Sequence, residues 1–253
     1  EAEKQETSEV SKKRELFTEG DWSAAIYLLF FNILIKKIKP AEDKTQSQNY
    51  ASPNSIKFQD NNTTQVFSGE NNPDVASAFY IENLLDNSLQ GDRYIEHLLL
   101  PLGIKMEFSS NGVTSLLTDL PNRSIELDFS KNPDLAQPFA CYMVAKKLTG
   151  KLSGLQTLKH KETDRIEALK NELSKVGADV QTDNSSLKIK GYADVFPEQK
   201  TFRTYNDHRM AMSLALVQIV HSNFEIENPV VVSKSFPDFW KTLEALGFEY
   251  EIV

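Results

Sequence analysis

The stretch Lys159-His160-Lys161-Glu162-Thr163-Asp164-Arg165 gathers basic side chains and one glutamate at the start of a predicted helix. Apolar residues follow it at helical spacing over positions 166–176, which is typical of an amphipathic helix. Thr163 or Asp164 can cap this helix, and Gly177 can end it. The free backbone N–H groups of a helix N-terminus already favour an anion, so the basic residues add to a tendency of the backbone itself.

Within this stretch, Lys161 and Arg165 are four positions apart and can face the same bound group. Glu162 lies between them, where it can donate or accept a proton. For the stretch alone, a capped surface helix with a solvated charge run is the simpler interpretation, because short motifs often match by chance. The rest of the chain has to decide between the two interpretations.

The composition limits the class of protein. The chain has 253 residues, 40% of them hydrophobic, so it can form one large or two modest cores. Its net charge of −8 disfavours nucleic-acid binding, and an anionic substrate would need a local cationic pocket. The single cysteine, Cys141, excludes an internal disulfide and fits a reducing compartment such as the cytoplasm. Four histidines and one cysteine without ligand spacing predict no metal, and we expect no cofactor.

Several segments lie outside the regular pattern. The longest apolar stretch, residues 24–35, is too short to span a bilayer, and no signal peptide is visible. The chain begins with Glu1 rather than Met, so we expect a piece of a longer protein or a processed one. Residues 1–17 predict a mobile tail. The polar residues 38–76 predict an insertion, either a disordered excursion, which we favour, or a short hairpin through 56–58 and 65–67.

The predicted elements form a unit that occurs three times. The unit is strand, helix, strand, helix, strand, strand, and the third copy lacks the last strand. Two of its strands, predicted over residues 151–158 and 224–232, lead into charged motifs. Asp21, Asp134 and Asp207 are predicted to cap the first helices, while the second helices begin at Asp92, Asp164 and Asp238 and end at Gly103, Gly177 and Gly247. Three such units predict a pseudo-threefold α/β domain with helices inside and sheets outside.

If the units pack around one axis, their strand-to-helix junctions meet at one end of the domain. Each junction carries charged residues, namely Lys161 with Arg165, His208 with Arg209, Lys234, and Asp134 at a fourth position. Such cations at helix N-termini predict an anion pocket. Any one of them alone is more often part of a surface ion pair, a cap or the core. The prediction therefore depends on their equivalent positions in the repeats.

Three motifs resemble those of the 5-enolpyruvylshikimate-3-phosphate (EPSP) synthase family, in the order and at the spacing of that family. They are Lys161-Glu162-Thr163-Asp164-Arg165, Tyr205-Asn206-Asp207-His208-Arg209-Met210-Ala211-Met212 and Lys234-Ser235-Phe236-Pro237-Asp238. Segments 20–25, 87–92 and 133–134 resemble the family as well, so the resemblance covers residues 18–36 and 79–253. It implies an enolpyruvyl transferase-like, inside-out α/β barrel lobe of three βαβαββ repeats.

Members of this family have two lobes, and the resemblance implies that residues 18–253 are most of the C-terminal lobe. We therefore expect the N-terminal lobe to be absent, together with the first strand that the family's extreme N-terminus lends to this lobe. The implied reaction is carboxyvinyl transfer from phosphoenolpyruvate to the 5-hydroxyl of shikimate 3-phosphate, which releases phosphate. The resemblance also implies a monomeric, cytoplasmic enzyme of aromatic amino-acid biosynthesis, without nucleic-acid or membrane partners.

The resemblance assigns Arg165, Arg209 and Lys234 to the phosphate and carboxylate of phosphoenolpyruvate. It assigns Glu162 to the same substrate as the candidate acid for the methylene carbon. Neighbouring cations would keep Glu162 ionised until a bound dianionic phosphate offsets them and raises its pKa. His208 would support the site by hydrogen bonding.

The resemblance assigns Asp134 and Lys161 to shikimate 3-phosphate and to catalysis, with Asp134 as the candidate general base for the 5-hydroxyl. Thr157 stands where the family often has asparagine, so this substrate contact departs from the family pattern. Two alternatives stay open. One is a lobe of the sister family, UDP-N-acetylglucosamine enolpyruvyl transferase, and the other is a non-catalytic lobe that only binds an anion or a partner.

Overall fold

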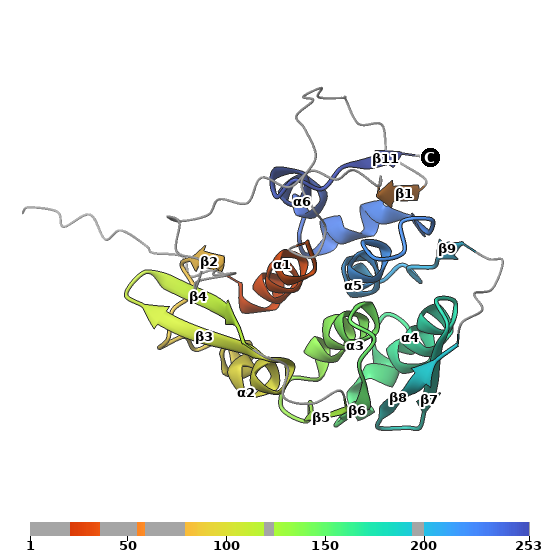
Figure 1. Ribbon diagram of the computed structural model, residues 1–253, viewed down its shortest axis with the longest axis horizontal. Helices are drawn as coiled ribbons and strands as arrows, with labels where there is room; N and C mark the ends of the chain where they lie inside the picture. The colour runs from red at the N-terminus through yellow and green to blue at the C-terminus, as the bar shows by residue number, and fades with distance from the viewer. Residues whose placement is uncertain (1–20, 36–54, 59–78, 119–123, 194–199, 253) are drawn as a thin grey trace, which may run out of the picture.

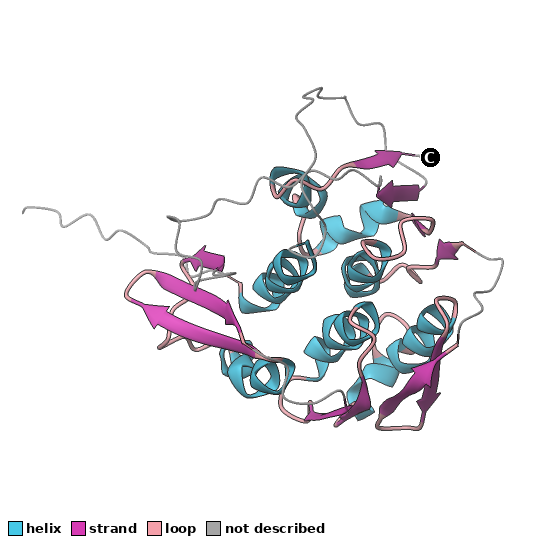
Figure 2. Cartoon of the chain, in the orientation of Figure 1, coloured by secondary structure: helices cyan, strands magenta, loops and turns pink. Residues whose placement is uncertain are grey.

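The computed structural model describes residues 21–35, 55–58, 79–118, 124–193 and 200–252. The predicted tail over residues 1–17 lies outside them. Helices gather in the centre and strands lie at the rim (Figures 1 and 2), which confirms the predicted arrangement of helices inside and sheets outside. Within the described ranges, no helix is both long enough and apolar enough to cross a membrane.

The first helix of each repeat lies at the centre of the domain. These helices are α1 (Trp22–Ile35), α3 (Ala136–Ala145) and α5 (His208–Gln218), and each contacts the other two. Because neighbours cover it on several sides, α1 is apolar nearly all round. Its Phe30 stacks on Tyr142 of α3, with the ring centroids 4.2 Å apart. Such aromatic pairs add about 0.5–1.5 kcal/mol beyond the area that they bury.

The second helices are shorter. They are α2 (Glu96–Leu99), which the 3-10 turns η1 (Gly91–Ile95) and η2 (Leu100–Leu102) extend on both sides, α4 (Arg165–Ser174) and α6 (Phe239–Ala245). After each of them the chain reverses at a glycine with positive φ, 72° at Gly103, 82° at Gly177 and 91° at Gly247. This conformation favours glycine, so the predicted ends of the second helices are confirmed.

Each repeat has a sheet of its own. The first has the strand order β2-β4-β3, the second β5-β6-β8-β7, and the third β9-β10-β1-β11. The strands are β1 (Ser55–Phe58), β2 (Phe79–Glu82), β3 (Ile104–Ser109), β4 (Gly112–Leu117), β5 (Ser124–Asp128), β6 (Thr149–Ser153), β7 (Ala178–Thr182), β8 (Leu187–Tyr192), β9 (Thr201–Phe202), β10 (Glu225–Glu227) and β11 (Tyr250–Ile252). In the second sheet β5 and β6 are parallel, while β8 is antiparallel to β6 and β7.

β1 occupies the place in the third sheet that β8 has in the second. It runs antiparallel to both β10 and β11, and Ile56 pairs with Ile226 on one side and Ile252 on the other. The sequence pattern assigned no fourth strand to the third repeat, and β1 takes that place. The interpretation of residues 38–76 as a disordered excursion is therefore wrong for Ser55–Phe58. The hairpin partner proposed at 65–67 lies outside the described residues.

Two predicted strands end earlier than expected. β6 stops at Ser153, because Gly154 has a φ of 78° and leaves the extended region, and residues 156–160 form the 3-10 turn η4 (Gln156–His160). A Cβ atom on Gly154 would lie 2.3 Å from the backbone nitrogen of Ser130, so the close approach requires glycine. β10 stops at Glu227, because Asn228 is left-handed and Pro229 begins the 3-10 turn η5 (Pro229–Lys234).

Candidate functional site

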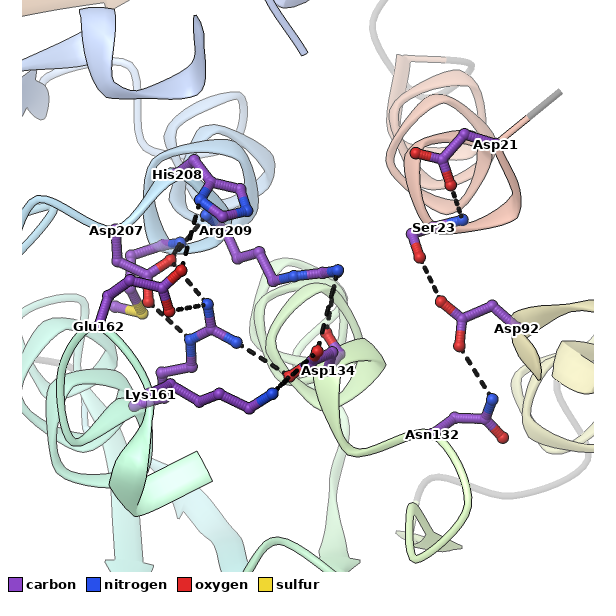
Figure 3. A network of polar contacts seen from close by, with 12 residues as sticks. Asp21, Ser23, Asp92, Asn132, Asp134, Lys161, Glu162, Asp207, His208 and Arg209 are labelled. Atoms are coloured by element: carbon purple, nitrogen blue, oxygen red, sulfur yellow. Dashed lines mark hydrogen bonds and ion pairs between the residues drawn. The ribbon is translucent and has the colours of Figure 1, made fainter. Parts of the chain in front are cut away.

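Three helix N-termini meet at one end of the domain. Asp134 lies in the 3-10 turn η3 (Pro133–Leu135) that leads into α3, Arg165 is the first residue of α4, and Asp207 caps α5. Figure 3 shows Asp134, Lys161, Glu162, Asp207, His208 and Arg209 gathered at this place. The charged motifs of the second and third repeats therefore lie side by side.

Arg165 is the centre of the cluster. Its side chain is only 2% exposed, and all three guanidinium nitrogens contact carboxylates. Nε donates to Asp207 Oδ2 at 2.6 Å, Nη1 to Asp134 Oδ1 at 3.0 Å, and Nη2 to Glu162 Oε2 at 2.7 Å. Charge-assisted hydrogen bonds of this kind are among the strongest in proteins. Because this guanidinium is nearly buried and held by three carboxylates, an anion has little direct access to it.

Asp207 is the buried partner of this arginine. Its side chain is 0% exposed, and its Oδ1 accepts hydrogen bonds from the backbone nitrogens of Arg209 at 2.8 Å and Met210 at 3.3 Å. The carboxylate thus caps α5 and neutralises Arg165 at once. The sequence predicted the cap but missed the ion pair. A signal was present, since a carboxylate capping a helix that is apolar on all sides must be buried, and a buried charge requires a partner.

Asp134 is the meeting point of three cations. Besides Arg165, Lys161 Nζ lies 3.2 Å from its Oδ1, and Arg209 Nη2 lies 4.0 Å from its Oδ2. Arg209 also donates to the backbone oxygen of Asp134 at 3.4 Å. The predicted cap at Asp134 is wrong, because the residue sits inside the first turn, where its carboxylate points to these cations. Asn132 holds the N-cap position instead and makes no side-chain cap.

Glu162 is a second carboxylate close by, on the solvent side of Arg165. Partial burial by itself would raise its pKa, but a backbone hydrogen bond and the charges of Arg165 and His208 outweigh this effect and hold the pKa below its ordinary value. Its Oε1 lies 3.9 Å from His208 Nδ1. Burial lowers the pKa of His208 below its ordinary value.

The remaining two predicted site residues lie further out. Lys234 is the last residue of η5, is exposed, and donates to the backbone oxygen of Asn206, directly before Asp207, at 2.8 Å. Thr157 is exposed within η4. For metal binding, the described residues contain no group of three or more His, Cys, Asp or Glu side chains that could hold an ion.

Comparison with known proteins shows the family to which the chain is related. The model of EPSP synthase (3-phosphoshikimate 1-carboxyvinyltransferase) matches residues 76–243, which is more than half of the chain. The chain belongs to this family. The matched residues 76–243 include Asp134, Lys161, Glu162, Arg165 and Arg209, so the matched region contains the cluster around Arg165.

Two relatives and one solved structure illustrate the similarity to members of this family. The 3-phosphoshikimate 1-carboxyvinyltransferase of Bacteroides fragilis is 36% identical over 175 residues, which are 68% of this chain and 42% of that protein. That of Photobacterium profundum is 33% identical over 160 residues, 63% of this chain and 36% of that protein. The chain thus spans less than half the length of these relatives. The structure of EPSP synthase from Acinetobacter baumannii, 17% identical, shares the fold with a TM-score of 0.54 over 92% of this chain and 48% of that one.

A second polar cluster, which the sequence analysis missed, joins the first repeat to the second. Asn132 Nδ2 donates to Asp92 Oδ1 and to the backbone oxygen of Gly91, both at 2.9 Å, and Ser23 Oγ donates to Asp92 Oδ2. Figure 3 shows this chain of contacts beside Asp134. Asn132 is two residues before Asp134 in the chain, so its hydrogen bond to Asp92 helps to position the backbone that carries the Asp134 carboxylate. The sequence identified Asp92 only as the start of a helix.

Proposed function

We propose that this chain forms the C-terminal half of the active site of a 3-phosphoshikimate 1-carboxyvinyltransferase. The observation that carries the proposal is the contact of one buried arginine, Arg165, with both candidate proton-transfer groups, Asp134 and Glu162. A site that must take a proton from one atom and give a proton to another needs two such groups in fixed relation. Family membership supports the same reaction.

The reaction has an addition and an elimination. The 5-hydroxyl oxygen of shikimate 3-phosphate forms a bond to C2 of phosphoenolpyruvate, the hydroxyl loses its proton, and the methylene carbon C3 gains one. The C2–O bond to phosphate then breaks, C3 loses a proton, and the carboxyvinyl ether and inorganic phosphate are released. Each half of the reaction therefore moves one proton at C3, and the elimination also builds negative charge on the leaving phosphate oxygen.

Asp134 and Glu162 divide the two proton transfers. Asp134, whose carboxylate contacts Lys161, Arg165 and Arg209, is placed to accept the hydroxyl proton. Glu162 shares its cation with Asp134, and its lowered pKa leaves it ionised in the free protein. A dianionic phosphate near Arg165 offsets the charge of this arginine and raises the pKa of Glu162, so that Glu162 can carry the proton for C3.

The cations divide by exposure. Lys161 and Arg209, 34% and 17% exposed, and the exposed Lys234 can reach a phosphate or carboxylate directly. Arg165, at 2%, fixes the carboxylates and contacts substrate only if Glu162 swings away. Cations aimed at the leaving phosphate stabilise charge that develops in the transition state. Thr157, on the neighbouring turn, would lie toward shikimate 3-phosphate.

The proposal includes a second lobe, because half of a cleft cannot exclude water or fix two substrates together. Correct orientation contributes about 7–11 kcal/mol in favourable cases, so residues 1–253 alone should turn over poorly while keeping weak affinity for phosphate. We place the complete enzyme in the cytoplasm as a monomer. A sugar-nucleotide transferase and a non-catalytic lobe are the competing functions.

The test supplies an N-terminal EPSP synthase lobe in trans or fused upstream of Glu1, and follows phosphate release from both substrates. Turnover should appear with shikimate 3-phosphate and not with UDP-N-acetylglucosamine. Glu162→Gln should then reduce it by about 10²–10⁴-fold, the usual contribution of a proton-transfer group, and Asp134→Asn should do the same. Glu167→Gln is the matched control, since Glu167 lies on α4 shortly after Glu162, is exposed, and its side chain pairs only with Lys170 among the residues described. Rapid turnover by residues 1–253 alone would contradict the proposal.

A further inference from the structure

The turn before Asp207 has a conformation that needs outside support. Tyr205 and Asn206 both have a φ of 55°, in the left-handed region. Asparagine adopts this region with some ease, but a bulky tyrosine does so rarely, and two such residues in succession persist only where their surroundings hold them. The turn ends at Asp207, which binds Arg165 and caps α5. Whatever holds the turn therefore also sets the position of the central ion pair.

Glu172 of α4 holds this turn from one side. Its side chain is almost fully buried, its Oε1 accepts a hydrogen bond from the Tyr205 hydroxyl at 2.8 Å, and its Oε2 accepts one from the backbone nitrogen of Arg203 at 2.9 Å. Lys175 Nζ lies 2.5 Å from Oε2 and donates to the backbone oxygen of Thr201 at 2.8 Å. A buried carboxylate without partners would be strongly unfavourable, and these contacts satisfy both of its oxygens.

Other contacts hold the turn from the opposite side. Asn228 Nδ2 donates to Asn206 Oδ1, and Lys234 Nζ donates to the Asn206 backbone oxygen, each at 2.8 Å. Because burial and the hydrogen bond and charge of Glu172 raise the pKa of Tyr205 to about 12, its hydroxyl keeps the proton that it donates to Glu172. The turn is thus held between α4 and η5. Two residues of α4 contact it, Glu172 through Tyr205 and Arg165 through Asp207.

We propose that Glu172 and Tyr205 are positioning residues, whose hydrogen bond holds Asp207, and through it Arg165, Arg209 and His208, in the arrangement that binds an anion. Neither residue touches substrate in this proposal. Two contacts join α4 to the third repeat, Arg165 to Asp207 and Glu172 to Tyr205. The second contact therefore sets the orientation of the first, in addition to stabilising the fold. The part of the inference that concerns anion affinity rests on the proposed function.

The first experiment needs no ligand. The imidazole of His208 is titrated by NMR in the full chain, in Tyr205→Phe and in Tyr192→Phe. Asp207, Arg209, Glu162 and Arg165 are the charged groups around this imidazole, so its pKa reports their positions. Tyr192 is the matched control, because its half-buried hydroxyl donates to Leu148 O at 2.7 Å and Met143 O at 3.3 Å, at the far end of α3 from Asp134.

Tyr205→Phe should move the His208 pKa toward that of a free histidine, while Tyr192→Phe leaves it unchanged at a similar loss of stability. Glu172→Gln keeps an oxygen acceptor and should shift it less than Tyr205→Phe. If the pKa of His208 were unchanged in Tyr205→Phe and in Glu172→Gln, the inference would be overturned.

The second experiment titrates inorganic phosphate against the same proteins. The dissociation constant should rise roughly two- to thirtyfold in Tyr205→Phe, the range for residues that act through others, and not in Tyr192→Phe. If the wild-type chain did not bind phosphate but the His208 pKa shifted as expected in Tyr205→Phe, the proposed anion site would be refuted and the positioning role would stand. If Tyr205→Phe and Tyr192→Phe bound phosphate equally and the pKa of His208 did not change, the proposed function would stand and the positioning role would be refuted.

Discussion

The Nε of Arg165 lies 2.6 Å from Oδ2 of Asp207, although one residue begins a helix of the second repeat and the other caps a helix of the third. Both side chains are almost completely buried, at 2% and 0% exposure. The contact therefore joins two repeats through a buried ion pair and helps to fix the distance between their helix N-termini. The site and the core share this contact, so changes here affect stability as well as binding.

Arg165→Ala should strongly destabilise the domain, because it leaves Asp207 buried without its cation. Removing one partner of a buried pair costs about 3–5 kcal/mol. Urea unfolding, followed by circular dichroism, measures the loss. Arg203→Ala is the control, since its Nε lies 3.7 Å from Glu227 on the surface, where an ion pair contributes less than about 1 kcal/mol. Equal unfolding midpoints for the two variants would show that Asp207 finds another partner.

Stability should fall as the pH drops through the ordinary histidine range. Burial lowers the pKa values of His208 and His221 in the folded state. Between the folded and unfolded pKa values the unfolded chain therefore binds more protons, and the free energy of unfolding decreases with decreasing pH. Urea unfolding between about pH 8 and about pH 5 spans this window.

His208→Gln should flatten this pH dependence, since it removes one of the two buried imidazoles. His160→Gln serves as the control, because His160 is exposed. The lowered pKa of Glu162 adds a loss of stability at lower pH, below the ordinary glutamate value, so it does not overlap with the histidine window. A slope that is the same in both histidine variants and in the wild type would contradict the prediction.

Lys234→Met should weaken phosphate binding by roughly fivefold, as expected for the loss of one exposed charge. Lys234 lies beside the Asn206 turn and can move toward an anion at low cost. The dissociation constant of inorganic phosphate, from isothermal titration calorimetry, should also rise with added salt, because exposed charges are screened over about 10 Å at 0.1 M. Lys241→Met, which removes an exposed lysine paired with Asp238, should leave the affinity unchanged. If both variants bound phosphate equally, Lys234 would not belong to the site.

Ile56→Pro should destabilise the third sheet. β1 is an inner strand, and Ile56 is paired on both sides, so proline removes a backbone donor where no edge is available. We expect a loss of about 1–3 kcal/mol, the cost of leaving a ladder partner without its hydrogen bond, measured by thermal unfolding. Ser124→Pro is the control, as it changes the first residue of β5 at the edge of the second sheet. If Ile56→Pro were as mild as Ser124→Pro, β1 would contribute little to the core.

The repeat and most of the site could be predicted from the sequence, because both follow from local patterns. Apolar periodicity and the glycines after the second helices gave the fold, and equivalent junctions pointed to Asp134, Lys161 and Arg165. What failed depended on long-range pairing. No local signal tells that Ile56 pairs with Ile226, and periodicity does not show that Asp207 is the partner of Arg165.

The position of Glu172 could not be predicted for a related reason. On a helical wheel it reads as one more polar residue among several on α4, and only the fold brings Tyr205 to it. Asp134 was placed at the right junction but with the wrong contact, because a cap depends on the exact backbone angles of the first turn. Sequence patterns specify which junction a residue occupies, whereas its partners follow from packing between repeats.

The place of β1 between β10 and β11 determines the order in which the domain can assemble. The first and second sheets pair strands that follow each other closely in the chain, so each can form soon after its own segment leaves the ribosome. The third sheet must bring Ile56 to Ile252 and encloses both other repeats in the resulting loop. Entropy of loop closure makes such distant pairings slow. We therefore expect the third sheet to close later than the other two, because it joins the most distant strands of the described chain.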